Sequence, residues 1–314
     1  MRFIFMGTPP FAATILKDML ANGLRPIAVY SQPPRNAGRG HKPQKNAVHV
    51  MAEQEGLPVY TPSSLASQEE EQRLKALHPD VGIVVAYGLL LPSHFLHTPP
   101  YGFLNIHASL LPRWRGAAPI QYALLAGDET TGVTLMKLTE IMDAGPIISS
   151  HAIPITDDLT TLSLGEELAQ AGARLLSESL APYCQGKLSP FPQPTQGITY
   201  APKIRKEDAH LSAHTKADIL VRKVRAFYPN PGAYFVYQGK RIKVMQASVL
   251  GPTHTFAQSL WGTATNTHLS IATPQGLFQP QIIQPAGKRP MSTAEFLRGF
   301  PISAGEQVLD QNAH

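Results

Sequence analysis

Cysteine is almost absent from the sequence, because Cys184 is the only one in 314 residues. A single thiol cannot form a disulfide within the chain, which excludes a disulfide scaffold and a zinc ribbon. We therefore expect a cytoplasmic protein, since the cytosol keeps thiols reduced. Long apolar runs are missing as well, and none reaches the roughly 18 residues that a membrane span requires. The short apolar start is broken at Gly7 and Pro9, so it is interpreted as a first strand and not as a signal peptide.

Several catalytic motifs are missing too. Neither glycine-rich phosphate loop, GxGxxG or GxxxxGKS/T, occurs, since the first predicted strand is followed by Gly7-Thr8-Pro9. The GxSxG motif of serine hydrolases, the HExxH zinc motif and any Cys/His cluster are also absent. A serine hydrolase and a zinc enzyme are therefore disfavoured, and we expect no bound metal.

Acidic residues are scarce in the C-terminal third of the chain. Residues 1–200 hold 14 Lys and Arg against 16 Asp and Glu, whereas residues 201–314 hold 13 against 6. The segment from Lys203 to Lys243 alone holds 10 basic and 3 acidic residues. A compact basic module beside a nearly neutral one is typical of a protein that binds a polyanion such as nucleic acid. The alternative is a solubilising surface without a partner, and charge alone leaves both open.

Short β-rich runs and helical stretches alternate through the first half of the chain. The predicted strands are 2–6, 27–30, 81–86, 103–107, 133–138 and 147–155, and the predicted helices are 11–20, 47–55, 119–126 and 157–183. Strand–helix–strand units fold as right-handed crossovers, so this alternation predicts an α/β fold with a doubly wound, mostly parallel sheet.

The second half has a different pattern. Residues 188–204 are rich in proline and lack periodicity, which is typical of a semi-rigid linker. Beyond them, a helix is predicted over 215–227, short strands over 234–237, 241–245, 269–273 and 278–283, and a capping box at Ser292 and Glu295. This pattern predicts a small β-barrel. The predicted domains are therefore 1–187 and 205–314, joined by the linker 188–204.

The predicted strand 103–107 ends in polar residues. Side chains two positions apart share one face of a strand, so Asn105 and His107 point the same way. In open α/β sheets the carboxyl ends of the strands border the ligand crevice, which makes this pair a candidate site. The alternative is a hydrogen-bonded polar pair packed beneath a loop.

The loop that follows, residues 108–119, is unusually apolar. Its centre, Leu110-Leu111-Pro112, precedes Trp114, which suits a wall for a flat ligand, and Arg113 and Arg115 are placed to meet an anion. The alternative is a loop that anchors on the core through its leucine and tryptophan.

Asp143 follows the predicted strand 133–138. We expect it at the same carboxyl edge of the sheet as His107, where a carboxylate can pair with the imidazole and fix its tautomer. The alternative is an aspartate that bonds to its own turn.

The connection 31–47 is long, polar and basic. It holds Arg35, Arg39, Lys42 and Lys45, and we expect a flexible loop that clamps phosphates and becomes ordered when its partner binds. The alternative is a surface excursion without a partner.

Five segments together carry a resemblance to a known family. They are Gly7-Thr8-Pro9 with Phe11-Ala12, Asn105-Ile106-His107, residues 109–120 (SLLPRWRGAAPI), Asp143-Ala144-Gly145 and residues 199–204 (TYAPKI). In this order and spacing the chain resembles, over nearly its whole length, the 10-formyltetrahydrofolate-dependent formyltransferases. It is most similar to those members whose formyl acceptor is the α-amine of methionine on initiator tRNA.

The resemblance implies both an architecture and residue roles. The fold would be a Rossmann-like catalytic domain followed by an OB-like barrel that holds tRNA. The implied catalytic residues are Asn105, His107 and Asp143, and the residues that would border 10-formyltetrahydrofolate are Ser109, Leu110, Leu111 and Pro112. The residues expected to contact tRNA are Arg39, Lys42, Lys203, Arg205 and Lys206. We expect a monomer whose partners are the folate and initiator methionyl-tRNA, with no metal and no membrane.

Three other functions remain open at this point. A formyltransferase that acts on a small amine, such as an amino sugar nucleotide or a purine precursor, would keep the same three catalytic residues. A hydrolase that releases formate from the folate would keep them as well. The third is an RNA-binding protein without activity, whose basic segment alone carries the function.

Overall fold

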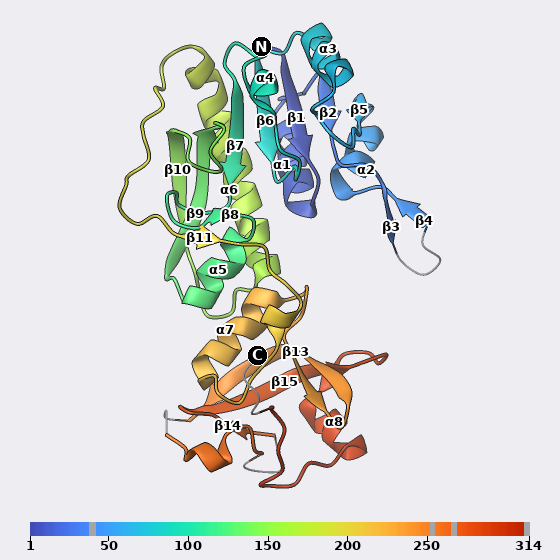
Figure 1. The fold of residues 1–314 in the computed structure, drawn as a ribbon, viewed down its shortest axis with the longest axis vertical. Helices are drawn as coiled ribbons and strands as arrows, with labels where there is room; N and C mark the ends of the chain where they lie inside the picture. The colour runs from blue at the N-terminus through green and yellow to red at the C-terminus, as the bar shows by residue number, and fades with distance from the viewer. Residues whose placement is uncertain (38–41, 252–254, 265–268, 311–314) are drawn as a thin grey trace. The chain divides into compact units, whose positions relative to one another are not determined.

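The structure, a computed structural model, describes residues 1–37, 42–251, 255–264 and 269–310 (Figure 1). The chain divides into two compact units. Unit 1 comprises residues 1–119, 130–154 and 165–201, and unit 2 comprises residues 120–129, 155–164 and 202–314. The domain limits derived from the sequence stay a prediction. Among the helices described, none is long and apolar enough to cross a membrane.

A seven-stranded sheet forms the centre of unit 1. Its strands, in spatial order, are β10 (Ile147–Pro154), β9 (Thr130–Lys137), β7 (Phe103–His107), β6 (Val81–Val85), β1 (Phe3–Gly7), β2 (Ala28–Tyr30) and β5 (Val59–Tyr60). The five strands from β7 to β5 are parallel, as predicted, and the apolar runs of β1, β2 and β6 suit strands buried on both faces.

One strand of this sheet, β9, runs against all the others, and the edge strand β10 runs in the same direction as the parallel set. β9 is antiparallel to β7, and β10 is antiparallel to β9. Two connections explain the difference from a wholly parallel arrangement. The nine-residue connection 138–146 contains no helix, and a connection of that kind joins antiparallel neighbours. The helix α5 (Pro119–Ala126), which lies between β7 and β9, groups from Ile120 onward with unit 2 and does not serve as a crossover.

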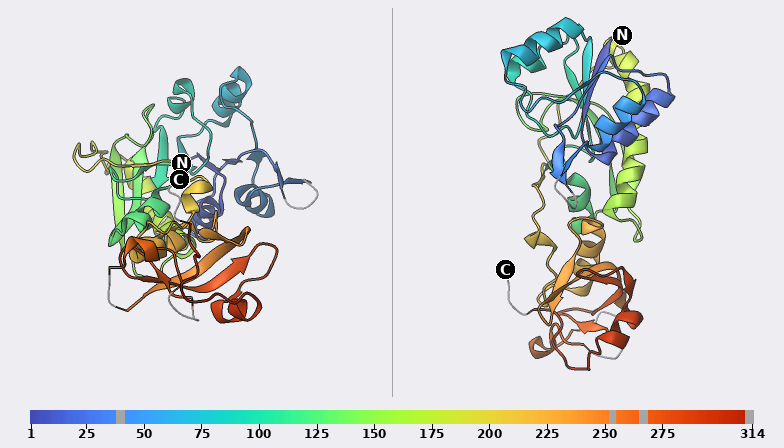
Figure 2. Two further views of the ribbon diagram at one scale, coloured as in Figure 1. Left: turned by 60° about the horizontal axis from the view of Figure 1, so that its bottom comes forward. Right: turned by 90° about the vertical axis from the view of Figure 1, so that its right-hand side faces the viewer.

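Helices cover both faces of this sheet, as Figure 2 shows. The first face packs against α1 (Pro10–Ala21), α2 (Ala47–Gln54) and α6 (Thr161–Cys184), and Gly172 of α6 lies directly over Ile106 of β7. The second face packs against α3 (Gln68–Leu77) and α4 (Ser93–Leu96) in a core that includes Phe95 and Phe103. Because side chains alternate along β7, Asn105 and His107 lie on the second face, beyond Phe103.

The chain enters α1 in a way that the sequence does not reveal. Pro9 occupies the N-cap position, and among the described residues no side chain caps the helix. The hydroxyl of the preceding residue, Thr8, donates to the carbonyl of Tyr87 at 2.8 Å. Thr8 therefore ties the end of β1 to the loop that follows β6.

The basic connection 31–47 contains regular structure. Its arms form a two-stranded antiparallel ribbon of β3 (Arg35–Ala37) and β4 (Lys42–Gln44), which projects from the rest of unit 1 in Figure 1. The arms of the expected flexible loop thus carry regular structure, while its centre, residues 38–41, lies outside the described residues and its role as a phosphate clamp stays a prediction.

A second small ribbon joins distant parts of unit 1. β8 (Arg115–Gly116) pairs in parallel with β11 (Tyr200–Ala201). Upstream of β11, Phe191 exchanges two backbone hydrogen bonds with Ile147, the first residue of β10. Residues 191–201, which we call the strap, therefore lie against unit 1 at both ends.

Unit 2 is built on an antiparallel sheet in the order β12 (Tyr234–Tyr237), β13 (Lys240–Leu250), β15 (Leu277–Pro285) and β14 (Ile271–Ala272), with β16 (Met291–Ser292) also paired to β15. The predicted hairpin at Gln238-Gly239 joins β12 to β13. The helix α7 (Ala217–Phe227) buries its apolar stripe, including Leu220 and Phe227, in the same core. The helix α8 (Thr293–Gly299) begins with the capping box predicted from the sequence.

Candidate active site

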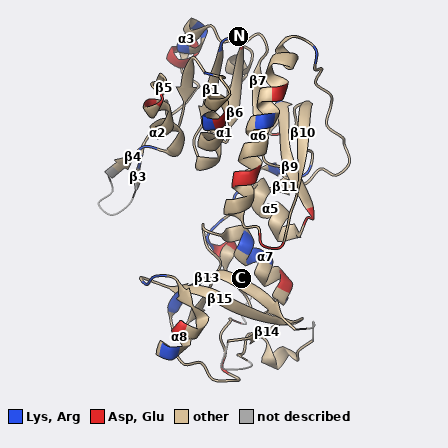
Figure 3. Ribbon diagram, turned by 180° about the vertical axis from the view of Figure 1, so that it is seen from behind, with Lys and Arg blue, Asp and Glu red and all other residues tan. Residues whose placement is uncertain are grey.

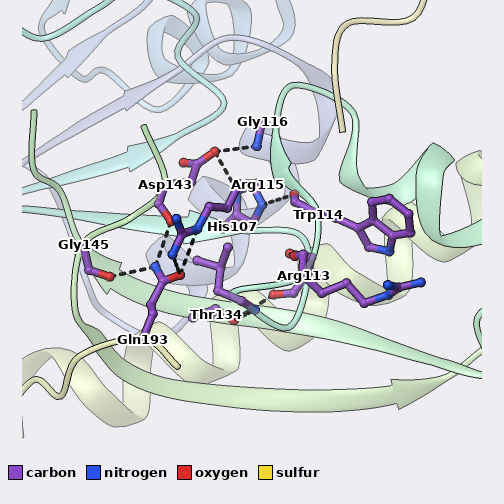
Figure 4. Close-up of polar contacts among 11 residues, drawn as sticks. His107, Arg113, Trp114, Arg115, Gly116, Thr134, Asp143, Gly145 and Gln193 are labelled. Carbon is purple, nitrogen blue, oxygen red and sulfur yellow. Dashed lines mark hydrogen bonds and ion pairs between the residues drawn. The ribbon is translucent and has the colours of Figure 1, made fainter. Parts of the chain in front are cut away.

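Two polar side chains lie in the middle of the buried sheet. All five residues of β7 are buried, and two of them are polar. Asn105 and His107 are only 8% and 6% exposed, and they share one face of the strand. Neighbouring Phe103 is covered by α4, whereas this part of the face is covered by the loops 108–118 and 138–146. A buried amide and imidazole form the centre of the candidate site. Figure 4 shows the imidazole of His107 with Trp114 and Asp143 from the two loops.

The imidazole of His107 has a defined orientation. Its Nε2 lies 2.9 Å from the backbone carbonyl of Trp114. Because a carbonyl oxygen only accepts, Nε2 must carry a hydrogen and donate it. Its Nδ1 lies 3.8 Å from Oδ2 of Asp143, so the ring is held from one side and faces a carboxylate on the other. The predicted proximity of His107 and Asp143 is therefore present.

Asp143 reaches this position by a route that differs from our expectation. We had placed it at the carboxyl edge of a parallel strand, but β9 runs against β7, so Lys137 at the end of β9 pairs with Leu104 near the start of β7. The loop 138–146 turns back over the face that carries His107. Gly145 permits the return, because a Cβ atom there would lie 1.8 Å from the carbonyl oxygen of Lys137.

The conformation of Asp143 is strained and specific. Its φ is +50°, in the left-handed region that non-glycine residues rarely adopt. Its Oδ2 accepts a 2.8 Å hydrogen bond from the backbone N–H of Gly116. The carboxylate is thus fixed from β8, a different element, and not by its own turn as in the alternative interpretation.

A hydroxyl from β9 pins the loop 108–118 to the sheet. Thr134 donates to the carbonyl of Ser109 at 2.7 Å and accepts from the N–H of Leu111 at 3.1 Å. Leu111 then packs in a small core with Met136 and Ile147. The loop is therefore anchored on the core through Leu111, which agrees with the leucine contact of the alternative interpretation.

Because the loop is anchored in this way, the four residues predicted to border the folate differ in their exposure. Ser109 is fully buried and its hydroxyl donates to the carbonyl of Arg113, while Leu111 is buried in the core. Leu110 and Pro112 are partly exposed. The folate contacts of these four residues stay a prediction.

The two arginines of the loop differ in environment. The guanidinium of Arg113 stacks over the ring of Trp114, 4.2 Å from its centre. Arg115 is only 9% exposed, and its Nε and Nη2 donate to the side-chain oxygen of Gln193 at 3.1 and 2.7 Å. Arg115 therefore contacts a neutral amide of the strap where we had considered an anion.

Gln193 is a residue that the sequence reasoning missed. Its side-chain nitrogen donates to the carbonyls of Asp143 and Gly145, each at 2.8 Å (Figure 4). The available signal was a lone amide between Pro192 and Pro194, in a segment interpreted as a linker. Two prolines fix the backbone on either side of Gln193 and so favour a defined side-chain position.

Two phenols stand on either side of β1. Tyr30 ends β2 and Tyr87 follows β6, and both are buried. Burial, together with the carboxylate of Glu70, raises the pKa of both phenols well above its ordinary value. Both groups therefore stay neutral at physiological pH.

The residues predicted to contact tRNA fall in two places. Arg39 lies outside the described residues, and Lys42 begins β4. Lys203, Arg205 and Lys206 are exposed at the start of the long segment of unit 2. Further basic residues follow along α7, as Figure 3 shows. Within the described parts of the chain, no three His, Cys, Asp or Glu side chains are grouped as metal ligands.

Comparison with known proteins places this arrangement in a family. A model described as formyl transferase matches residues 1–180, and a model of the formyl transferase C-terminal domain matches residues 203–301. The chain belongs to the formyl transferase family. The family resemblance predicted from the sequence is thereby confirmed.

Curated relatives of this formyl transferase match it over nearly its full length. The methionyl-tRNA formyltransferase of Paramagnetospirillum magneticum is 45% identical over 306 residues, covering 97% of this chain and 99% of the relative. The methionyl-tRNA formyltransferase of Sphingopyxis alaskensis is 46% identical over 312 residues, covering 98% and 100%.

Solved structures support the fold of this formyl transferase. HypX from Aquifex aeolicus, in complex with tetrahydrofolic acid, has a TM-score of 0.64 at 18% identity and matches 96% of this chain and 47% of its own. An N-formyltransferase from Helicobacter canadensis, in complex with folinic acid and dTDP-3-aminofucose, has a TM-score of 0.64 at 17% identity, covering 89% and 99%. At such identities the likeness extends to the fold alone.

Proposed function

We propose that this formyl transferase moves the formyl group of 10-formyltetrahydrofolate to the α-amine of methionyl-tRNA. The observation that carries the proposal is the meeting of Asp143, from the loop over the sheet, with the buried face of β7 that carries Asn105 and His107, in a chain whose full-length relatives are named methionyl-tRNA formyltransferases. We further propose that it acts in the cytoplasm as a monomer, and its single cysteine suits a reducing compartment.

The side chains present suit a formyl group. The carbonyl oxygen of a formyl group gains negative charge when an amine attacks its carbon. Asn105 offers amide N–H groups, and His107 offers Nδ1–H in its protonated form, on the same face of β7 and almost wholly removed from water. Donors fixed in such a site stabilise a developing oxyanion strongly, because they need no reorganisation during the reaction.

The geometry of His107 assigns the two ring nitrogens different tasks. Nε2 donates to the carbonyl of Trp114 in the neutral and in the protonated ring, so it fixes the orientation of the imidazole. Nδ1 is left to exchange a proton on the side of Asp143. In the proposed reaction the amine nitrogen bonds to the formyl carbon, the bond from that carbon to N10 breaks, and the proton lost by the amine passes through this pair toward N10.

Charge distinguishes the proposed acceptor from a small amine. An amino sugar nucleotide or a purine precursor would need the same buried side chains but not the basic segment from Lys203 to Lys243, with its 10 basic and 3 acidic residues. A stem of RNA suits such a segment because phosphate contacts dominate the affinity of proteins for nucleic acids. We therefore propose that Arg39, Lys42, Lys203, Arg205 and Lys206 contact tRNA.

The deciding experiment compares acceptors. The purified full chain is incubated with formyl-labelled 10-formyltetrahydrofolate and either methionyl-tRNA, the uncharged tRNA, an amino sugar nucleotide, or buffer alone. We expect label only on methionyl-tRNA. Label on the sugar would replace the proposal by the small-amine alternative, and release of formate without an acceptor would indicate a hydrolase.

The roles of the buried pair are tested by two nearly isosteric changes. We expect His107→Asn to lower kcat by about 10²–10³, the usual effect of losing one oxyanion donor. We expect Asp143→Asn to lower kcat by about 10²–10⁴, the range of general acid–base catalysis. KM for both substrates should stay within a few fold in each variant. The control is His151→Asn, an exposed histidine of β10, and near-normal turnover in His107→Asn would remove His107 from the scheme.

A further inference from the structure

We infer that Gln193 is a positioning residue, which holds the Asp143 loop over His107 while Arg115 orients the Gln193 amide. The inference rests on the proposed function, since it gives Asp143 a task in formyl transfer. It assigns a role at the active site to the strap, residues 191–201, which the sequence pattern marks only as a linker.

The hydrogen bonds of Gln193 fix which end of its amide points where. The oxygen accepts both bonds of the Arg115 fork, at 3.1 and 2.7 Å. An arginine can only donate, so the nitrogen must face the other way, where it donates to the carbonyls of Asp143 and Gly145 at 2.8 Å each. The amide is thus used at both ends, and a reversed amide would lose all four bonds.

The Asp143 loop needs an external hold. With φ at +50°, Asp143 adopts a conformation that costs on the order of 1–3 kcal/mol unless its surroundings impose it. Gln193 bonds to the carbonyl of Asp143 itself and to that of Gly145, two residues later. These bonds hold the segment from which the carboxylate projects toward the Gly116 N–H and the His107 ring.

The strap supplies a fixed base for this contact. Upstream of Gln193, the backbones of Phe191 and Ile147 exchange hydrogen bonds of 2.8 and 2.9 Å. Downstream, the hydroxyl of Thr199 accepts from the N–H of Trp114 at 2.9 Å, and its carbonyl accepts from the N–H of Arg115 at 2.9 Å. The strap therefore contacts the loop that orients Nε2 of His107 as well as the loop that carries Asp143.

A single-atom change separates the two ends of the amide. Gln193→Glu keeps an oxygen for Arg115 but replaces the donating nitrogen by an oxygen that faces two carbonyl oxygens. We expect kcat to fall by about 10–100-fold, because a displacement of about 1 Å in an active site costs rate of this order, with KM for both substrates within a few fold. The matched control, Gln196→Glu, makes the same charge change at an exposed position of the strap and should keep wild-type kcat.

A second measurement reports on the loop without substrates. Hydrogen exchange of the Gly116 amide, followed by NMR in the ligand-free full chain, monitors its bond to Asp143. We expect Gln193→Glu to speed this exchange at least tenfold in the wild-type background and to change it little in an Asp143→Ala background, where the bond no longer exists. Arg115 keeps its acceptor throughout, so loosening of β8 by itself does not produce this pattern.

The outcomes separate the inference from the proposed function. If the wild-type chain transfers formyl groups and Asp143→Asn does not, while Gln193→Glu shows normal kcat and normal Gly116 exchange, the positioning role of Gln193 is refuted and the function stands. If Gln193→Glu lowers the melting temperature and kcat equally in the wild-type and Asp143→Asn backgrounds, its role is structural and the inference fails. If the wild-type chain transfers nothing, the proposed function fails, and accelerated Gly116 exchange still tests the contact itself.

Discussion

One hydroxyl connects the sheet to the loop 108–118. The side chain of Thr134 is fully buried and is the hydrogen-bond partner of both the Ser109 carbonyl and the Leu111 N–H. Three residues earlier on the same strand, Thr131 is 3% exposed and its hydroxyl finds no partner among the described residues. Two buried threonines of β9 thus differ in the one respect that decides whether a hydroxyl stabilises the fold.

The pair yields a matched prediction of stability. Thr134→Val leaves a buried backbone N–H without a partner, so we expect the free energy of unfolding to fall by about 1–3 kcal/mol. Thr131→Val removes a hydroxyl that is buried at a cost, so stability should be unchanged or higher. Thermal or urea unfolding of the two variants beside the wild type measures both. Equal losses in the two variants would show that the Thr134 bonds contribute nothing net.

Strand β8 is only two residues long, but it and the residue before it hold both His107 and Asp143. The residue before it, Trp114, accepts from the His107 ring, and Gly116 donates to Asp143. The partner strand β11 closes against it so tightly that a Cβ on Gly116 would lie 2.7 Å from the carbonyl oxygen of Ala201. With φ at +118°, Gly116 also has a backbone that other residues rarely adopt.

The close pairing of β8 with β11 is tested by a substitution at Gly116. We expect Gly116→Ala to part β8 from β11 and to lower kcat about tenfold or more, because the donor to Asp143 moves with the strand. Gly197→Ala is the control: it lies in the strap, has φ of +80°, and has no described atom within 4 Å of the added Cβ. That variant also places an alanine at positive φ, but without the clash, and should keep most activity. Similar kcat values for the two variants would contradict the role of the ribbon.

Local pattern predicted most elements but not the contacts between distant ones. Period-two alternation places Asn105 and His107 on one face because that rule is a property of a single strand. The reversal of β9 was missed, since direction depends on where α5 packs and not on the sequence of the strand itself. The ribbon of β8 and β11 was missed for the same reason, because its two partners lie far apart in the chain.

In the candidate site, too, local patterns were predictable from the sequence and contacts between distant residues were not. Asp143 and His107 were paired from the sequence because a carboxylate and an imidazole after neighbouring strands suggest a pair. The route by which Asp143 arrives was wrong, since it depends on a loop that returns over the sheet face. Gln193 was missed because its contacts with Arg115 and Asp143 span 78 and 50 residues, a range at which no periodic signal exists.

Charged residues are unevenly distributed along the chain. The residues of the buried site come from the segment of nearly balanced charge, residues 1–200, which hold 14 basic and 16 acidic side chains. The excess of basic residues begins at Lys203, directly after the strap. Folate binding and tRNA binding should therefore respond differently to salt, because only the second releases counterions from a polyanion.

This difference gives a prediction for the full chain. We expect the affinity for methionyl-tRNA to fall linearly on a plot of log K against log salt concentration. Between 50 and 200 mM salt, a protein that binds through phosphate contacts loses about 10³–10⁵ in affinity. Over the same range the affinity for the folate should stay nearly constant. Replacing Lys203, Arg205 and Lys206 together by Ala should lower the slope by up to about 3, near 1 for each lost phosphate contact.

The control removes the same charge elsewhere. Lys17, Arg174 and Lys187 are exposed residues of unit 1, and their triple replacement by Ala changes the net charge equally. Binding is measured by filter retention or fluorescence over the same salt series for all three proteins. If the slope depends only on net charge, it will become smaller by the same amount in both triple variants, and the basic residues after the strap have no specific role. If it depends on contacts at those residues, only the first variant will change, since screened charges more than a Debye length (about 10 Å at 0.1 M) from the RNA contribute little.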